Sequence, residues 1–174
     1  MLTTPAAVRK LTSWGFEALG LRTWTAHTLE RAGETLTVEA LPGVHAYGTM
    51  GRLLPPVMGS LLRYAGPSGT RSLYITGDTL PGNHLDEIRD RHPHIDATVA
   101  HLGGTRVLLH TVTMDAPMGL ELLRRVPTPH VVPVHHDDYG VFRSRVSDFV
   151  DLVARSDVRT TVTVPARGDT VTLW

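Results

Sequence analysis

The sequence contains no cysteine. This absence excludes disulfide bonds, thiolate zinc sites and cysteine nucleophiles, and it leaves the redox compartment undetermined. The sequence also lacks any apolar run of about 18 residues, the length that a transmembrane helix requires, and its N-terminus has no apolar signal-peptide core. We therefore expect no membrane partner and, by default, a cytoplasmic location.

An excess of charge of one sign is also missing. Lys plus Arg and Asp plus Glu both number 17, so the formal net charge is zero. A nucleic-acid-binding domain normally carries a basic patch, and we therefore expect no nucleic-acid partner. Lys10 is the sole lysine, which rules out most lysine-based mechanisms.

The length of the chain and its histidine content indicate what kind of protein remains. The 174 residues, of which 41% are hydrophobic, suffice for a single globular domain spanning residues 1–174. Histidine is common, with ten residues. Because imidazole binds metals and titrates near neutral pH, the histidines are candidates for a metal site or for acid–base catalysis.

Hydrophobic periodicity and turn residues predict an α/β fold. Strands and helices alternate through the second half, and a turn at residues 66–69 predicts an antiparallel hairpin. Asp115 and Ser144 are expected to cap the helices that follow them. The predicted helices lie near residues 5–14, 83–91, 116–123 and 145–153, and the predicted strands near 19–25, 36–40, 57–64, 71–76, 95–100, 130–134, 160–164 and 171–174.

Three predicted strands run into loops whose first polar side chain is a metal-binding type: His45, Asp78 and His135. An Asp directly after a buried strand is held by a rigid element, which suits a metal ligand or a charged catalytic group. A mixed set of imidazole and carboxylate ligands suits Zn²⁺, Mn²⁺ or Fe²⁺. A surface or capping role is the alternative for each histidine.

The residues around these three side chains resemble the later metal-binding motifs of the metallo-β-lactamase superfamily, in the expected order. Further segments resemble the branch that includes ascorbate-6-phosphate lactonase and the phospholipase D-type enzymes acting on N-acyl ethanolamine phospholipids. The three motifs are residues 41–45 (LPGVH), 74–79 (YITGDT) and 132–139 (VPVHHDDY), and the further segments are residues 96, 101–105, 112–115 and 142–149.

The resemblance implies a metallo-β-lactamase-like αβ/βα sandwich and hydrolysis of an ester, lactone or phosphodiester by a metal-activated water. It implies that His45 binds a first metal ion, that Asp78 bridges two ions, and that His135 binds the second. Zinc is the favoured metal, with manganese or iron as alternatives. His136 stands where this branch more often has tyrosine, which leaves open which of the adjacent histidines is the ligand; His135 is favoured because it directly follows the strand.

One expected motif is missing. The first metal motif of the superfamily, His-x-His-x-Asp-His, does not occur, and the first residues resemble the segment shortly after it. We therefore expect an N-terminally truncated sandwich that lacks its first sheet and half of its ligands, and weak metal binding by the isolated chain. A homodimer or a separate N-terminal half would cover the exposed sheet. A non-catalytic remnant acting as a subunit or interaction module is the alternative function.

The remaining polar residues are assigned less sharply. His101 and His136 are candidates for contact with a small-molecule substrate, although His101 is equally compatible with a structural role. The carboxylates at 137 and 138 either orient His135 or cap their loop. The histidines on or beside the predicted helix at 83–91, namely His84, His92 and His94, are expected to be solvated.

Overall fold

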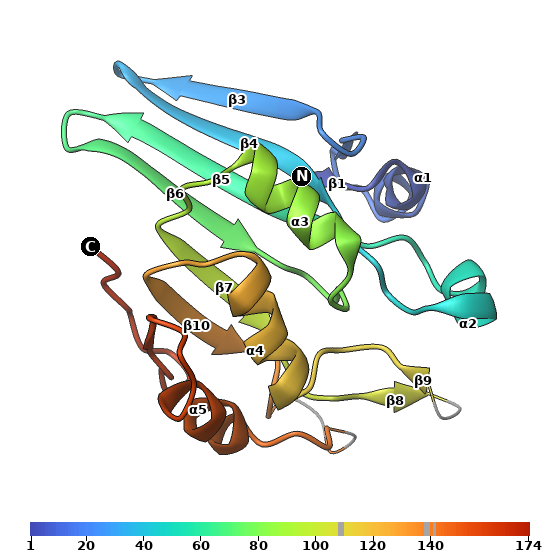
Figure 1. Cartoon of the computed structure of the whole chain (residues 1–174). Coiled ribbons are helices and arrows are strands. Elements are labelled where there is room, and N and C mark those ends of the chain that lie inside the picture. Colours follow the sequence, from blue (N-terminus) through green and yellow to red (C-terminus); the bar gives the residue numbers. More distant parts are fainter. Residues whose placement is uncertain (108–109, 138–139, 141) are drawn as a thin grey trace.

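The computed structural model describes residues 1–107, 110–137, 140 and 142–174 (Figure 1). The strands are β1 (Leu2–Thr3), β2 (Leu19–Gly20), β3 (Ala26–Arg31), β4 (Glu34–Pro42), β5 (Met58–Gly66), β6 (Gly69–Ile75), β7 (Ala97–His101), β8 (Arg106–Val107), β9 (His110–Thr111), β10 (His130–Val134) and β11 (Thr161–Val162). The helices are α1 (Pro5–Ser13), α2 (Gly48–Leu53), α3 (Asn83–Arg91), α4 (Ala116–Arg125) and α5 (Val146–Ala154). Among the described residues, no helix is long and apolar enough to cross a membrane.

A seven-stranded sheet in the order β11-β10-β7-β6-β5-β4-β3 forms the centre of the molecule. Strands β3 to β6 are antiparallel neighbours, and the predicted hairpin between β5 and β6 is confirmed by the pairing of Gly66 with Gly69. The strands β6, β7, β10 and β11 are parallel. The apolar runs of the second half therefore form the parallel strands that their composition predicts.

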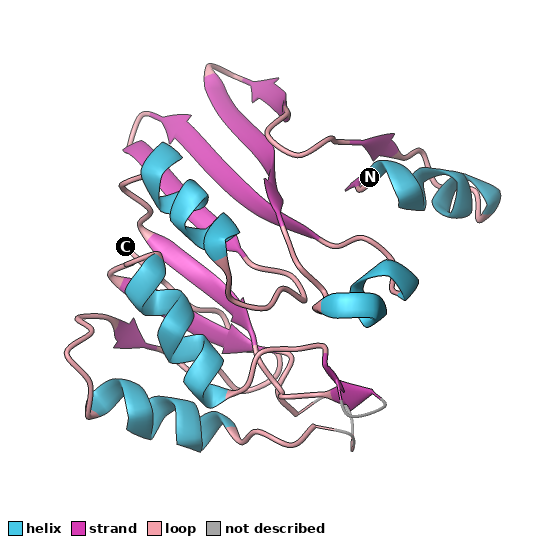
Figure 2. Cartoon of the chain, turned by 45° about the vertical axis from the view of Figure 1, so that its right-hand side comes forward, coloured by secondary structure: helices cyan, strands magenta, loops and turns pink. Residues whose placement is uncertain are grey.

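Helices α3, α4 and α5 lie against one face of this sheet (Figures 1 and 2). Each helix turns an apolar stripe toward the strands, as the 3.6-residue period requires. The core between the two layers includes Leu85 and Ile88 of α3, Leu122 and Leu123 of α4, and Phe149 of α5, packed against Leu41, Leu61, Tyr74, Ala100 and Val131 of the sheet.

The opposite face of the sheet is also apolar. Because side chains alternate along a strand, the register places Leu36, Leu62 and Leu73 side by side on the face turned away from the helices. All three are half-buried, and with Trp174 they line an apolar groove of about 140 Å³. Trp174 itself remains 57% exposed.

Two strand predictions were wrong. Of residues 19–25 only Leu19–Gly20 pairs, and it pairs with β1 rather than with the main sheet. The first strand of the main sheet is β3, a mostly exposed edge strand whose polar sequence lacks the expected alternation. Residues 171–174 form no strand in the described structure.

In addition, the long loop after His45 contains helix α2. The glycine and proline content of this loop obscured the helix in the sequence.

Of the two capping predictions, one is confirmed and one is wrong. Asp115 caps α4, because its carboxylate accepts a hydrogen bond from the Met118 N–H at 3.1 Å. Ser144 does not cap α5, whose N-cap is Arg145. The Ser144 hydroxyl instead accepts a hydrogen bond from the Ala116 N–H at 2.9 Å, so it caps α4 from a distant segment.

Candidate metal centre

The carboxyl ends of the parallel strands carry the candidate site. Strands β6, β7 and β10 are neighbours in register, with Ile75 opposite Val99 and Val134 opposite His101. Because parallel strands run in the same direction, their carboxyl ends lie at one edge of the sheet, and so do the residues just beyond them. This edge brings together Asp78, His101 and His135.

The carboxylate of Asp78 faces the imidazole of His135. Their Oδ1 and Nδ1 atoms lie 3.7 Å apart. Two ligands of a tetrahedral zinc ion stand about 3.3 Å apart, so this pair fits a shared divalent ion with a small adjustment. The Asp78 Oδ1 atom is buried, and it has no hydrogen bond within the described parts of the chain. The ring of His101 lies 5.7 Å from that of His135, centroid to centroid.

Left-handed backbone turns set the direction of both side chains. Gly77, with φ of 62°, precedes Asp78, and a side chain at position 77 would meet the Met58 carbonyl oxygen at 2.9 Å. His135 itself has φ of 57°. A non-glycine residue in this region costs about 1 kcal/mol or more, and such strain concentrates at functional sites. His135, whose imidazole faces Asp78, thus has a strained backbone conformation.

A segment from the loop before α5 supports His135. The ring of Phe142 lies 4.8 Å from the His135 ring, centroid to centroid. The next two residues, Arg143 and Ser144, donate their backbone N–H groups to the Gly103 carbonyl oxygen at 2.8 and 3.1 Å. Because Ser144 also caps α4, this segment links the surroundings of the His135 ring to the loop after β7 and to α4.

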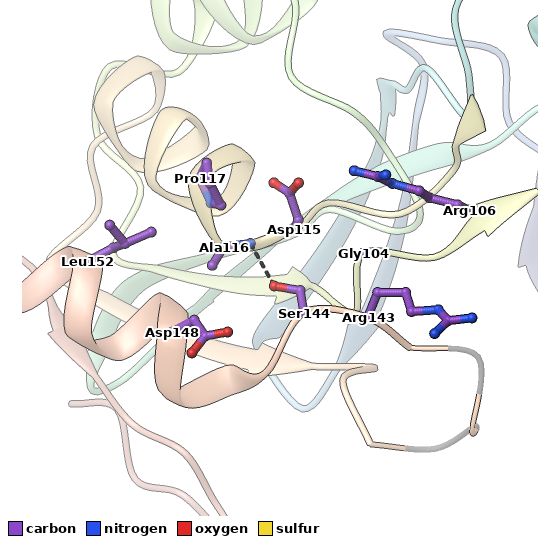
Figure 3. Close-up of a pocket in the computed structure, with 9 residues that line it drawn as sticks. All are labelled: Gly104, Arg106, Asp115, Ala116, Pro117, Arg143, Ser144, Asp148 and Leu152. Carbon is purple, nitrogen blue, oxygen red and sulfur yellow. Dashed lines mark hydrogen bonds between the residues drawn. The ribbon is translucent and has the colours of Figure 1, made fainter. Parts of the chain in front are cut away.

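A cavity of about 650 Å³ opens beside this segment (Figure 3). In the close-up, the arginines lie on one side and Pro117 and Leu152 on the other, with the capping bond from Ala116 to Ser144 between them. The arginines and aspartates of the lining are equal in number, so its formal charge is zero. The lining residues are Gly104, Arg106, Asp115, Ala116, Pro117, Arg143, Ser144, Asp148 and Leu152.

Asp78 lines a different, smaller cavity. This cavity has a volume of about 290 Å³ and is formed by the N-terminal segment and the start of β5. Its polar lining includes Thr3 and Thr4 beside Asp78. Asp78 is thus part of the lining of this cavity, and His135 is not.

The structure places His45 in a separate position. Its Nδ1 atom lies 3.3 Å from the Pro55 carbonyl oxygen, which belongs to the segment after α2. Within the described residues, no three His, Asp or Glu side chains form a group that could hold a metal ion. Asp78 and His135 are therefore a facing pair of donors, and His45 does not complete a three-ligand site with them.

His136 has a different carboxylate as its neighbour. Its Nδ1 atom lies 3.8 Å from the Asp137 carboxylate, which also forms an ion pair with Arg167 at 3.4 Å. Asp137 thus lies beside His136 and Arg167. The second carboxylate considered for orienting His135, Asp138, lies outside the described residues.

Another histidine–carboxylate pair lies on the helix-covered face, and the sequence did not reveal it. The side chain of His92 is only 8% exposed, so the prediction that it is solvated was wrong. Its Nε2 atom lies 3.4 Å from Glu39, and its Nδ1 atom contacts the Arg63 guanidinium. Burial lowers the pKa of His92, and the nearby Glu39 carboxylate partly offsets this effect. Glu39, Arg63 and His92 are distant in sequence, and only β4–β5 pairing brings them under α3.

Solved structures with a similar fold include hydrolases. An isothiocyanate hydrolase from Delia radicum gut bacteria matches with a TM-score of 0.75 and 18% identity, over 100% of this chain and 68% of that chain. The metallo hydrolase Igni18 from Ignicoccus hospitalis matches with 0.75 and 20%, over 98% and 66%. A metallo-β-lactamase fold protein, YhfI from Bacillus subtilis, matches with 0.61 and 11%, over 97% and 62%. Neither the family models nor the curated protein sequences yielded a match.

These comparisons establish the fold. The chain has the metallo-β-lactamase-like α/β fold, as its three motifs predicted, and it spans about two thirds of the length of the three solved structures named above. At these identities the likeness concerns the fold alone, and the chemistry of this chain must be argued from its own residues.

Proposed function

We propose that this chain carries part of the metal site of a metal-dependent hydrolase, in which Asp78 and His135 bind one divalent ion. The observation that carries the proposal is the 3.7 Å approach of their donor atoms at the carboxyl edge of the sheet. Zn²⁺ is the favoured ion, with Mn²⁺ or Fe²⁺ as alternatives, because the donors are one oxygen and one imidazole nitrogen. His45 is proposed as a ligand of a separate, first ion, with Asp78 between the two.

The reaction that this site supports is hydrolysis of an ester, a lactone or a phosphodiester in a small molecule. A bound divalent ion would lower the pKa of a water molecule and polarise the oxygen of the scissile group. His101 and His136 are proposed to contact the substrate. The 650 Å³ cavity beside Arg143 has the size of a small-molecule site, although neither His101 nor His136 lines it. The balanced charges of its lining favour a substrate group without a large net charge.

Metal analysis of protein purified without chelator tests this proposal. We expect bound zinc in the wild type and at least a roughly tenfold loss of affinity in Asp78→Ala, because removing a ligand leaves a single donor. Asp90→Ala, which removes an exposed carboxylate on α3, is the matched control and should bind zinc like the wild type. Less than about a tenth of a zinc ion per chain, with no change in Asp78→Ala, would reject the proposal.

The second candidate function is a non-catalytic subunit or interaction module. It is favoured by the lack of a three-ligand group among the described residues and by the apolar face that carries Leu36, Leu62 and Leu73. An apolar face of this kind is usually covered by another polypeptide. We propose a second copy of this chain as the cover, with a separate N-terminal half as the other outcome.

Light scattering at micromolar concentration tests whether a second copy of the chain covers this face. A homodimer is expected in the wild type, and Leu62→Glu should shift it to a monomer because the charge would be buried at the interface. Leu152→Glu is the matched control, because Leu152 lies on α5, on the other side of the sheet. A monodisperse wild-type monomer would contradict the homodimer and would leave the separate N-terminal half as the cover to test by co-expression.

A further inference from the structure

Thr79, the residue after Asp78, connects the two loops that carry predicted ligands. Its side chain is almost fully buried, with 1% exposed. The Thr79 Oγ1 atom accepts a hydrogen bond from the Val44 N–H at 2.8 Å. The next residue, Leu80, donates its N–H to the Val44 carbonyl oxygen at 2.8 Å. Both backbone polar groups of Val44 are therefore bonded to residues 79 and 80.

These bonds hold His45 in place relative to Asp78. Val44 immediately precedes His45, and it lies beyond the end of β4 at Pro42, where the sheet no longer pairs the chain. On the other loop, Thr79 immediately follows Asp78. Each of the two hydrogen-bonded residues, Val44 and Thr79, is thus a direct neighbour in sequence of a predicted ligand. Tyr47 adds a contact of the same kind, because its hydroxyl donates to the Pro81 carbonyl oxygen.

His84 completes the arrangement from the first turn of α3. Its Nε2 atom lies 3.2 Å from Thr79 Oγ1. A hydroxyl can accept one hydrogen bond from Val44 and donate its one proton to His84 at the same time, provided that Nε2 carries no proton. The Leu80 carbonyl oxygen is a more distant acceptor for this proton, at 3.5 Å. Burial lowers the pKa of His84, which keeps the ring neutral near pH 7. The expectation that His84 is solvated thus gives way to a half-buried ring with a specific partner.

We propose that Thr79 is a positioning residue, which with His84 fixes the backbone of His45 against that of Asp78 and so prepares both side chains to bind metal. The metal-binding part of this inference rests on the proposed function, whereas the fixing of Val44 can be measured without metal. Residues that orient ligands typically change metal affinity by about 10–100-fold when they are replaced.

Thr79→Val tests the inference, because valine keeps the shape of threonine and removes the hydroxyl. We expect amide hydrogen exchange at Val44 to accelerate about tenfold in the metal-free protein. We also expect zinc affinity to fall about tenfold, and Thr79→Ser to restore both values. The matched control is Thr128→Val, which removes another buried hydroxyl, bonded to the His130 carbonyl oxygen at 3.1 Å at the opposite end of β10. It should change neither value.

The outcomes separate this inference from the proposed function. Unchanged exchange at Val44 in Thr79→Val would overturn the inference, whatever the zinc result. Faster exchange at Val44 with unchanged zinc affinity would also overturn it, since the bond would then have no bearing on the ligands. If the wild type binds no zinc, the proposed function fails. The exchange rates at Val44 in the wild type, Thr79→Ser and Thr79→Val then decide alone whether the hydroxyl fixes the two loops as stated.

Discussion

The molecule contains two histidine–carboxylate pairs, and they differ in what surrounds them. His92 and Glu39 are buried under α3, 8% and 16% exposed, and Arg63 contacts both. His135 and Asp78 are 26% and 34% exposed at the sheet edge. Within the described residues, Asp78 forms no ion pair with Arg or Lys. In the first pair, Arg63 provides the cation. In the second pair, a cation from solution could bind.

This difference indicates that the pair of Glu39 and His92 is structural, whereas the pair of Asp78 and His135 is a candidate metal site. A buried carboxylate needs a partner, and at Glu39 the fold provides an arginine and a histidine on packed elements. At Asp78 the fold provides a cavity, a left-handed turn on each side of the pair, and an imidazole held by Phe142. Backbone strain of this kind is typical of functional positions.

The largest expected effect concerns the two carboxylates. Glu39→Ala should lower the free energy of unfolding by about 2 kcal/mol, because it leaves the Arg63 guanidinium without its anion and the buried His92 ring without its polar neighbour. Asp78→Ala should change it by less than about 0.5 kcal/mol in the presence of chelator, because Asp78 has no such cation. Urea unfolding of both variants checks this, and equal losses would remove the distinction between the pairs.

The next effect concerns backbone strain at His135. His135→Gly should be more stable than His135→Ala by about 1 kcal/mol, because glycine adopts φ of 57° without steric cost. At His92, whose φ is −129°, glycine should instead be less stable than alanine. Thermal unfolding of the four variants measures both differences. A preference for alanine at position 135 would show that the turn is not strained.

The smallest effect is a pH dependence that belongs to His92. Its pKa is lowered in the folded protein from an ordinary value of 6.5, so the unfolded chain binds more protons as the pH falls through that value. Stability contributed by neutral His92 is thus present above about pH 6.5 and declines below it until the folded pKa is reached. His92→Gln should flatten the urea-unfolding profile between about pH 7.5 and about pH 5.5, whereas His94→Gln should leave it unchanged, because His94 is exposed.

The sequence revealed most of the sheet because its parallel strands carry continuous apolar runs. It failed at β3, because an exposed edge strand needs no apolar alternation. It also assigned Ser144 to the nearer helix, although the hydroxyl bonds to the Ala116 N–H, 28 residues away. Capping by a distant segment depends on tertiary packing, which no local pattern contains.

For the candidate site, too, local patterns were informative and tertiary contacts were not predictable. Strand-end positions selected His45, Asp78 and His135 together, and the structure brings Asp78 close to His135. The roles of Thr79 and His84 could not be predicted, since the bond from Val44 to Thr79 joins segments that are 35 residues apart. The burial of His92 depends likewise on Glu39 and Arg63, which reach it only through the pairing of β4 with β5.

The central claim is that Asp78 and His135 bind the same divalent ion, and a zinc-affinity double-mutant cycle tests it most directly. Asp78→Ala and His135→Ala should each weaken zinc binding at least roughly tenfold, and the double variant should bind little more weakly than either single variant, because one site is lost only once. The corresponding cycle at Glu39 and His92 should leave the affinity unchanged. Zinc binding by the wild type that survives both single substitutions would contradict the claim.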